Sequence, residues 1–193
     1  MGCRAHTGWA ALVVVVGGVA RPEVLFRHRA ELGDPAGRVK RNVYQASRGL
    51  EPDKAAGAVQ AAEEIAAEQA AAAFERTVRD ANDRGAVVCS CAVVVGSFPS
   101  AARLESILRS HALAHAAEGH LYQHALLNGA QAQELETFAI PKRTIWEQGE
   151  SALGLDRDDL PGWIDRLRRE LGPPWGEDQK LAALAAWIAL ARR

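Results

Sequence analysis

Apolar residues in the first 50 positions follow patterns that are typical of β-strands. Trp9 to Val16 is an apolar run rich in valine, which predicts a buried strand closed by Gly17-Gly18. From Glu23 to Leu32 apolar and polar residues alternate, as in a half-exposed antiparallel strand. The short connection between these runs predicts a hairpin. A more polar extended segment, Val39 to Ser47, is predicted to be an edge strand.

The rest of the chain alternates between helical and extended patterns. We expect a long alanine-rich helix from about Asp53 to Asn82 and a buried strand from Ala86 to Val95. A second helix is predicted from about Ala101 to Ala130, followed by a short strand from Leu135 to Ile140. Three further helices are expected over residues 142–153, 159–171 and 177–192.

This order of elements indicates a fold class. Three strands followed by alternating helices and strands predict one α/β domain over residues 1–193, with a mixed sheet and helices packed on its faces. The order βββαβαβα resembles the ribonuclease H-like fold, and the C-terminal helix lies where that superfamily has its last element. The resemblance covers most of the chain at the level of topology.

Composition narrows the classes of partner. The chain has 23 basic and 24 acidic side chains, so its near-neutral surface as a whole does not attract nucleic acid or an acidic membrane, although a local patch remains open. The basic residues Arg27, Arg29, Lys40, Arg41 and Arg48 could form such a patch for nucleic acid, or a charged strand edge that resists aggregation. Exposed apolar helix faces would also allow a homodimer.

The cysteines and the N-terminus bear on the compartment. An odd number of cysteines, Cys3, Cys89 and Cys91, favours buried thiols in a reducing compartment over disulfides or a metal site. Arg4 and the apolar run after it could imitate a signal peptide, but the cleavage pattern is missing and a strand fits better. No run approaches the roughly 20 apolar residues that span a bilayer. We therefore expect a soluble, cytoplasmic protein without a membrane partner.

A polar stripe on the second predicted helix is the most informative feature. Helical residues advance by about 100° each, which places His111, His115 and Glu118 within roughly 60° of one another. Apolar residues project in the same direction, so we expect this stripe to face the sheet, with His120 and His124 exposed on the other side. The stripe could be a structural hydrogen-bond network, a functional pocket or a divalent metal site. His6 is expected to lie opposite it.

Three segments resemble the active-site segments of RuvC-type resolvases. Ala5-His6-Thr7-Gly8 is similar to the first-strand segment, with His6 in place of the aspartate. Cys89-Ser90-Cys91 falls in the region of the fourth-strand glutamate, and Glu177-Asp178 opens a segment similar to the acidic final helix. The resemblance implies carboxylates that hold divalent metal ions, of which this chain retains only Glu177 and Asp178. Both acids also suit a helix N-terminus without any metal.

Two functions of different classes follow. The first is a ribonuclease H-like domain with a non-standard pocket that acts as a metal-assisted phosphodiesterase or nuclease. In that case His111, His115 and Glu118 are metal ligands or a general base, His6 is a further catalytic candidate, and Glu177 and Asp178 are additional metal ligands. The second is a noncatalytic binding or assembly protein in which the same cluster is structural. The sequence leaves open whether the protein is an enzyme.

Overall fold

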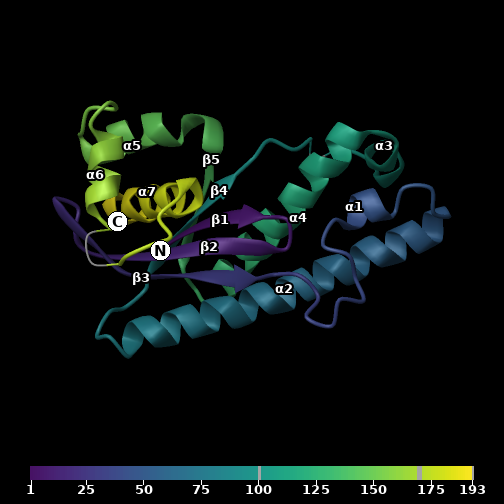
Figure 1. The fold of residues 1–193 in the computed structure, drawn as a ribbon, viewed down its shortest axis with the longest axis horizontal. Helices are drawn as coiled ribbons and strands as arrows, with labels where there is room; N and C mark the ends of the chain where they lie inside the picture. Colours follow the sequence, from purple (N-terminus) through teal and green to yellow (C-terminus); the bar gives the residue numbers. More distant parts are fainter. Residues whose placement is uncertain (100, 169–170, 193) are drawn as a thin grey trace.

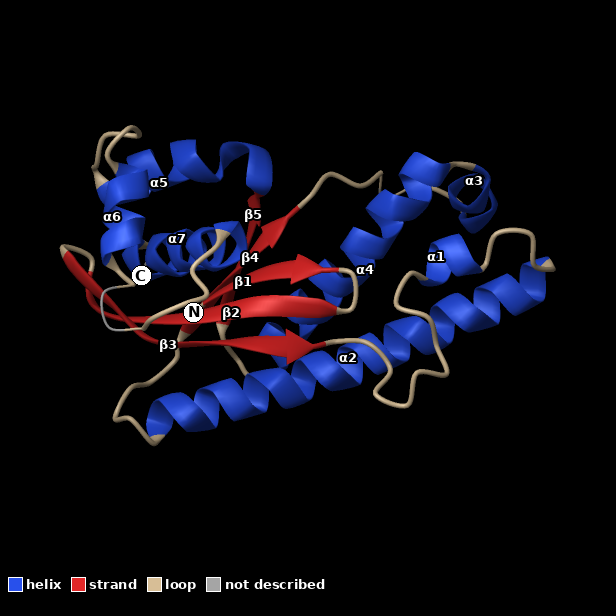
Figure 2. Ribbon diagram, in the orientation of Figure 1, coloured by secondary structure: helices blue, strands red, loops and turns tan. Residues whose placement is uncertain are grey.

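The protein is built on one five-stranded mixed sheet with the strand order β3-β2-β1-β4-β5 (Figures 1 and 2). The computed structural model describes residues 1–99, 101–168 and 171–192. Strands β1 (Gly2–His6), β2 (Trp9–Gly18) and β3 (Arg21–Glu31) form an antiparallel meander. Strands β4 (Ser90–Val95) and β5 (Glu136–Pro141) extend the sheet in parallel with β1. The mixed α/β class and the order of the main elements are confirmed.

Helices cover both faces of this sheet. Helices α2 (Pro52–Asn82) and α4 (His111–Ala132) lie on one face, and α7 (Glu177–Ala191) lies on the other. Helices α5 (Ile145–Leu153) and α6 (Leu160–Arg166) pack against α7. The smaller elements are α1 (Val43–Ala46) and α3 (Leu104–Arg109), both beside α4, and the 3-10 turn η1 (Lys142–Thr144) before α5.

The central strands are apolar on both faces because both faces are covered. Along β2, Leu12 and Val14 belong to the core under α2 and α4, whereas Val13 and Val15 belong to the core under α7. Along β1, Cys3 points into the α2–α4 core, where its sulfur lies 3.8 Å from that of Cys91 on β4. This alternation means that the intervening β1 residues face α7.

Strand β1 and helix α7 approach each other at backbone distance. A β-carbon placed on Gly2 would overlap the carbonyl oxygen of Ala182 and lie 2.6 Å from the backbone nitrogen of Ala186. The alanine-rich character of α7 serves the same packing, because small side chains let a helix lie close to a sheet. This contact fixes where α7 lies over the sheet.

The predicted edge strand from Val39 to Ser47 is wrong. The segment contains the short helix α1, and the loop before it is held by the carboxylate of Asp34, which accepts hydrogen bonds from the backbone nitrogens of Ala36, Arg38 and Val39. Tertiary packing therefore determines the conformation of this segment, since Tyr44 of α1 is buried in the α2–α4 core.

Other predicted boundaries also shift. The first strand of the meander is Gly2–His6, which the sequence pattern did not predict. The predicted strand over 86–95 begins only at Ser90, and the predicted helix over 101–130 is broken at Ser110, whose hydroxyl accepts the N-terminal hydrogen bond of α4 from Leu113. Of the predicted helix over 159–171, residues 169–170 lie outside the described residues. In the described part of the chain, no helix has both the length and the apolar character needed to cross a membrane.

Candidate functional site

The structure brings together two of the predicted site residues, His6 and Asp178, although 172 positions separate them. Because Cys3 and Ala5 point into the α2–α4 core, Arg4 and His6 point toward α7. Nε2 of His6 lies 2.6 Å from Oδ1 of Asp178, in the first turn of α7. The same carboxylate oxygen lies 4.0 Å from Nε of Arg4. The end of β1 and the start of α7 thus share one ionic cluster.

A single arginine on β3 fixes the segment that leads into α7. The guanidinium of Arg27 donates hydrogen bonds to the carbonyl oxygens of Leu171, Gly172 and Pro174, at 3.2, 3.2 and 2.9 Å. Three carbonyls held by one planar guanidinium define the path of the loop. This contact places the first turn of α7, and with it Asp178, beside β1.

Glu177 also pairs with a cation of the protein. Its Oε1 lies 2.8 Å from Nζ of Lys142 in η1, and this hydrogen bond and charge lower the pKa of the glutamate. Glu177 and Asp178 both lie in the first turn of α7, where negative charge is favourable. Both acids are therefore where the sequence placed them, and each has a cationic partner.

A stack of three side chains adjoins His6. Register pairs His6 with Trp9 across the β1–β2 hairpin, and their rings stack with centroids 4.5 Å apart. The guanidinium carbon of Arg29 on β3 lies 3.9 Å from the Trp9 ring centroid. Arg41 packs its side chain over Gly8 in the hairpin turn. We call His6, Trp9, Arg29 and Arg41 the basic surface.

Sequence reasoning missed Trp9 and Arg4 as site residues. The signal was available: a two-residue turn at Thr7-Gly8 would have paired His6 with Trp9, and strand alternation would then have put Arg4 on the same face as His6. The first predicted strand began at Trp9, and this hid both relations.

The polar stripe of α4 lies on the α2–α4 side of the sheet, whereas His6 faces α7 on the other side, so the expectation that His6 lies opposite the stripe is wrong. The stripe itself only partly faces inward. Glu118 is 1% exposed, as predicted for this residue. His111 and His115 are exposed, with the side chain of His115 63% accessible, which corrects the expectation that these imidazoles face the sheet. The N-terminal end of α4 lies beside α1 and α3, and α1 occupies the space on its inner side.

The contacts within this stripe attach α1 to α4. The backbone nitrogen of Gln45 donates to Oε1 of Glu118 at 3.0 Å, and the Gln45 side chain bonds both the carbonyl oxygen and Nδ1 of His111, at 3.1 and 3.2 Å. Nδ1 of His115 lies 3.8 Å from Oε2 of Glu118, an ion pair only when the imidazole is protonated. These contacts support the structural interpretation of the cluster.

Replacing Glu118 with glutamine is expected to remove part of the pH dependence of stability. Burial raises the pKa of Glu118, so the folded state holds the proton more tightly than the unfolded chain. The associated stability is present below the ordinary glutamate pKa of about 4.5 and is lost as pH rises through the raised value. Urea unfolding at pH 4.5, 5.5 and 7 should therefore show the free energy of unfolding of Glu118→Gln rising relative to that of the wild type as the pH rises.

Glu68→Gln, an exposed position on α2, is the matched control and should follow the wild type at every pH. If Glu118→Gln and wild type keep a constant difference across the three pH values, the proposed titration of Glu118 is refuted.

The ionic cluster at His6 does not have the ligands of a divalent metal site. Mg²⁺ and Ca²⁺ require several oxygen ligands, but the two acids here are Asp178 and Glu177, and Asp178 is already bonded to His6. Arg4 adds a fixed positive charge beside Asp178. In the portion of the chain that the structure describes, no group of three or more His, Cys, Asp or Glu side chains is arranged to hold a metal ion.

The predicted match between Cys89-Ser90-Cys91 and a fourth-strand glutamate does not hold spatially. In the parallel register Arg4 lies opposite Val94, so the end of β4 that continues toward His6 carries Val95 and Gly96. Cys91 lies near the start of β4, beside Cys3. The position near His6 is therefore apolar.

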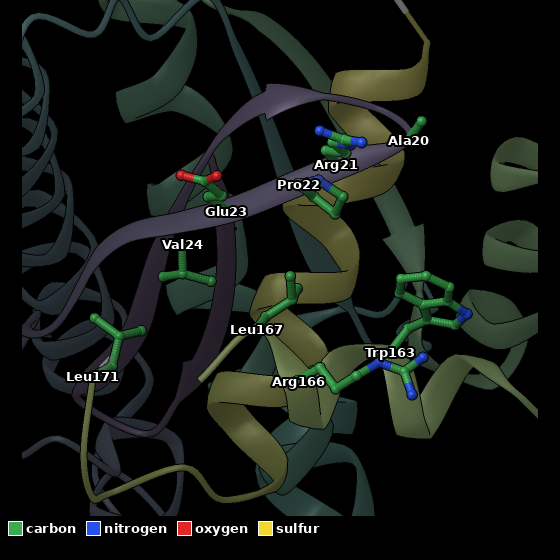
Figure 3. A pocket seen from close by; sticks show the side chains of 9 residues that line it. All are labelled: Ala20, Arg21, Pro22, Glu23, Val24, Trp163, Arg166, Leu167 and Leu171. Atoms are coloured by element: carbon green, nitrogen blue, oxygen red, sulfur yellow. The ribbon is translucent and has the colours of Figure 1, made fainter. Parts of the chain in front are cut away.

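A hollow lies away from this cluster, between the tip of the β2–β3 hairpin and α6 (Figure 3). Its volume is about 610 Å³, and Arg21, Glu23 and Trp163 are among the residues that line it. The guanidinium of Arg166 lies 4.2 Å from the centroid of the Trp163 ring. Because a cation of the protein already covers this indole, the hollow has no open aromatic surface from Trp163 to offer on that side.

Comparison with known proteins identifies the fold. No protein-family model matches the chain, and no curated protein matches its sequence. A solved structure of T. thermophilus RuvC in complex with a Holliday junction substrate superposes with a TM-score of 0.53 and 14% identity, over 97% of this chain and 88% of that chain. A second Thermus thermophilus RuvC structure gives 0.51 and 12%, over 97% and 89%. The chain therefore has a ribonuclease H-like fold of the RuvC type.

Proposed function

We propose that this protein binds nucleic acid through the basic surface and does not cleave it by metal-assisted chemistry. One observation carries the proposal: Asp178, an acid retained from the resolvase pattern, is bonded to His6 at 2.6 Å and lies beside Arg4. The carboxylate that a metal ion would need is thus already in contact with two side chains of the protein. The exposed Arg29 and Arg41 of the basic surface can attract a phosphate backbone.

The basic surface offers exposed cations to a phosphate backbone, which is the electrostatic component of sequence-tolerant nucleic-acid binding. Arg29 and Arg41 are 51% and 58% exposed, and both share Glu31 as their acidic partner. Exposed ion pairs contribute only about 0–1 kcal/mol, so phosphate can replace Glu31 at little loss. The ring of Trp9 is already in contact with His6 and with the guanidinium of Arg29, and it helps to hold both in place. Branched DNA is the first ligand to test, because a fold neighbour was solved with a Holliday junction.

A second candidate function is metal-independent phosphodiester hydrolysis with His6 as the general base. His6 is 37% exposed and is bonded through Nε2 to Asp178, which is how a carboxylate orients a catalytic imidazole. In this scheme the neutral imidazole keeps its proton on Nε2 and donates a hydrogen bond from it to Asp178. The unprotonated Nδ1 is then the base that accepts a proton from water. The metal-assisted site at His111, His115 and Glu118 has weaker support, because Glu118 is bonded to Gln45 and both imidazoles are exposed.

The test is fluorescence anisotropy with a labelled four-way DNA junction, a duplex and a single strand, with Mg²⁺ or with EDTA. We expect binding that is unchanged by EDTA and weakened by salt. The double variant Arg29→Ala, Arg41→Ala should bind about 10- to 100-fold more weakly, and the slope of log K against log salt should fall by about 2. Arg21→Ala, at the opposite end of β3, is the control and should bind as the wild type does.

The same samples are followed for cleavage on denaturing gels. Intact DNA in Mg²⁺ together with charge-dependent binding supports the proposal. Cleavage that needs Mg²⁺, or binding that is unaffected by the double arginine variant, contradicts it. Cleavage that persists in EDTA and disappears in His6→Ala favours the second candidate instead.

A further inference from the structure

A hollow of about 330 Å³ opens beside the first turn of α7, next to the ionic cluster. Its size falls at the lower end of the range of about 300–1,000 Å³ that is usual for small-ligand pockets. Glu177 lines the hollow, and the next residue in the chain, Asp178, is the partner of His6 on the basic surface. Its lining comes from η1, α5, the start of α7 and the two residues before it: Lys142, Trp146, Trp175, Gly176, Glu177, Lys180 and Leu181.

Two indoles form the aromatic part of this lining. Trp146 on α5 is half-buried, and Trp175, just before α7, is 8% exposed. The Nε1–H of Trp175 is enclosed, yet no hydrogen-bond acceptor reaches it among the residues that the structure describes. An enclosed donor without an acceptor is unfavourable, and buried Trp usually finds a partner for this group. Trp146 therefore offers a partly exposed ring for stacking, whereas Trp175 contributes an enclosed ring edge with an unused donor.

Two lysines supply positive charge at the same hollow. Nζ of Lys142 lies 2.8 Å from Glu177, and Nζ of Lys180 lies 2.8 Å from Asp165. Both pairs are partly exposed and contribute little net free energy, so either ammonium group can turn to a bound anion. The N-terminus of the 15-residue helix α7 adds favourable potential for negative charge.

We propose that this hollow binds a nucleotide, that is, an aromatic base that carries a phosphate. The base lies against Trp146 and Trp175, and the phosphate lies between Lys142 and Lys180. Such a nucleotide has two sources: a free mononucleotide, or an unstacked nucleotide of a bound nucleic acid. Only the second source rests on the proposed function, and it is consistent with the position of the hollow next to the basic surface.

The first arm of the test measures free ligands. Isothermal titration of the full chain with AMP, adenosine and inorganic phosphate is expected to show AMP binding tighter than either part, since the site has both a stacking surface and cations. Trp146→Ala and Lys142→Ala should each weaken AMP binding by roughly 10-fold. Trp163→Ala, which alters the other hollow, is the matched control and should leave AMP binding unchanged. Circular dichroism checks folding, and Trp146→Phe, which keeps an aromatic ring, should retain most of the affinity.

The second arm uses a single-stranded oligonucleotide with one 2-aminopurine, whose fluorescence reports the stacking of that base. Binding should change this fluorescence in the wild type and not in Trp146→Ala. AMP binding without oligonucleotide binding supports a free nucleotide as the ligand and counts against the proposed function. Oligonucleotide binding that is indifferent to Trp146, together with no AMP binding, overturns the nucleotide site and leaves the proposed function standing.

Discussion

Gly2→Ala is expected to destabilise the protein by about 3 kcal/mol or more, because the added methyl group has no space between β1 and α7. The nearest atoms are backbone atoms, the carbonyl oxygen of Ala182 and the nitrogen of Ala186, which cannot turn away as a side chain could. Accommodation requires α7 to move off the sheet. That movement would open the core under α7 and separate Asp178 from His6, so loss of stability and loss of the ionic cluster should occur together.

Urea unfolding followed by circular dichroism measures the effect. Gly18→Ala is the matched control, because a β-carbon at the end of β2 meets no atom within 4 Å and its stability should stay within about 0.5 kcal/mol of the wild type. Equal stabilities of the two variants would show that the close approach of β1 and α7 is not real.

Trp187→Ala is expected to lower the free energy of unfolding by about 3–5 kcal/mol. Trp187 lies on α7, is 2% exposed and fills the core between this helix and the sheet. Its Nε1–H also donates to the carbonyl oxygen of Val19 in the β2–β3 turn, at 2.9 Å. Truncation therefore leaves a large cavity and an unpaired carbonyl, and the hairpin tip loses its attachment to α7.

Trp187→Phe separates these two contributions. The phenyl ring keeps much of the packing but cannot donate to Val19, so a smaller loss of about 1–2 kcal/mol is expected. Thermal and urea unfolding should rank the three proteins as wild type, phenylalanine variant, alanine variant. A phenylalanine variant as unstable as the alanine variant would mean that the hydrogen bond, and not the packing, dominates.

Periodicity predicted the elements that are long or buried on both faces. Each of three elements repeats one pattern over enough residues to be recognised: the valine run of β2, the alternation of β3 and the alanine-rich sequence of α2. The five residues of β1 include Arg4 and His6, which are tolerated on a central strand only because they face the start of α7. The contact between β1 and α7 is tertiary, and the pattern of apolar and polar residues along the chain does not reveal it.

The site was predictable in composition but not in arrangement. His6 and Asp178 were both candidates, but their pairing depends on where α7 begins, and this is fixed by the hydrogen bonds of Arg27 to a distant loop. The helical wheel placed Glu118 inward but not the neighbouring imidazoles. The wheel treats α4 as if the sheet lay beneath its whole length, whereas the small helix α1 lies beside its first turns.

The two buried sulfurs at the centre of the sheet have a practical consequence. Cys3 and Cys91 lie on adjacent strands and are fully enclosed, whereas Cys89 is half-buried near the start of β4. A thiol reagent can reach Cys3 and Cys91 only when the core between the sheet and helices α2 and α4 opens, so the rate of their modification measures the opening of this core. The natural chain thus carries its own probe of unfolding, with no label to introduce.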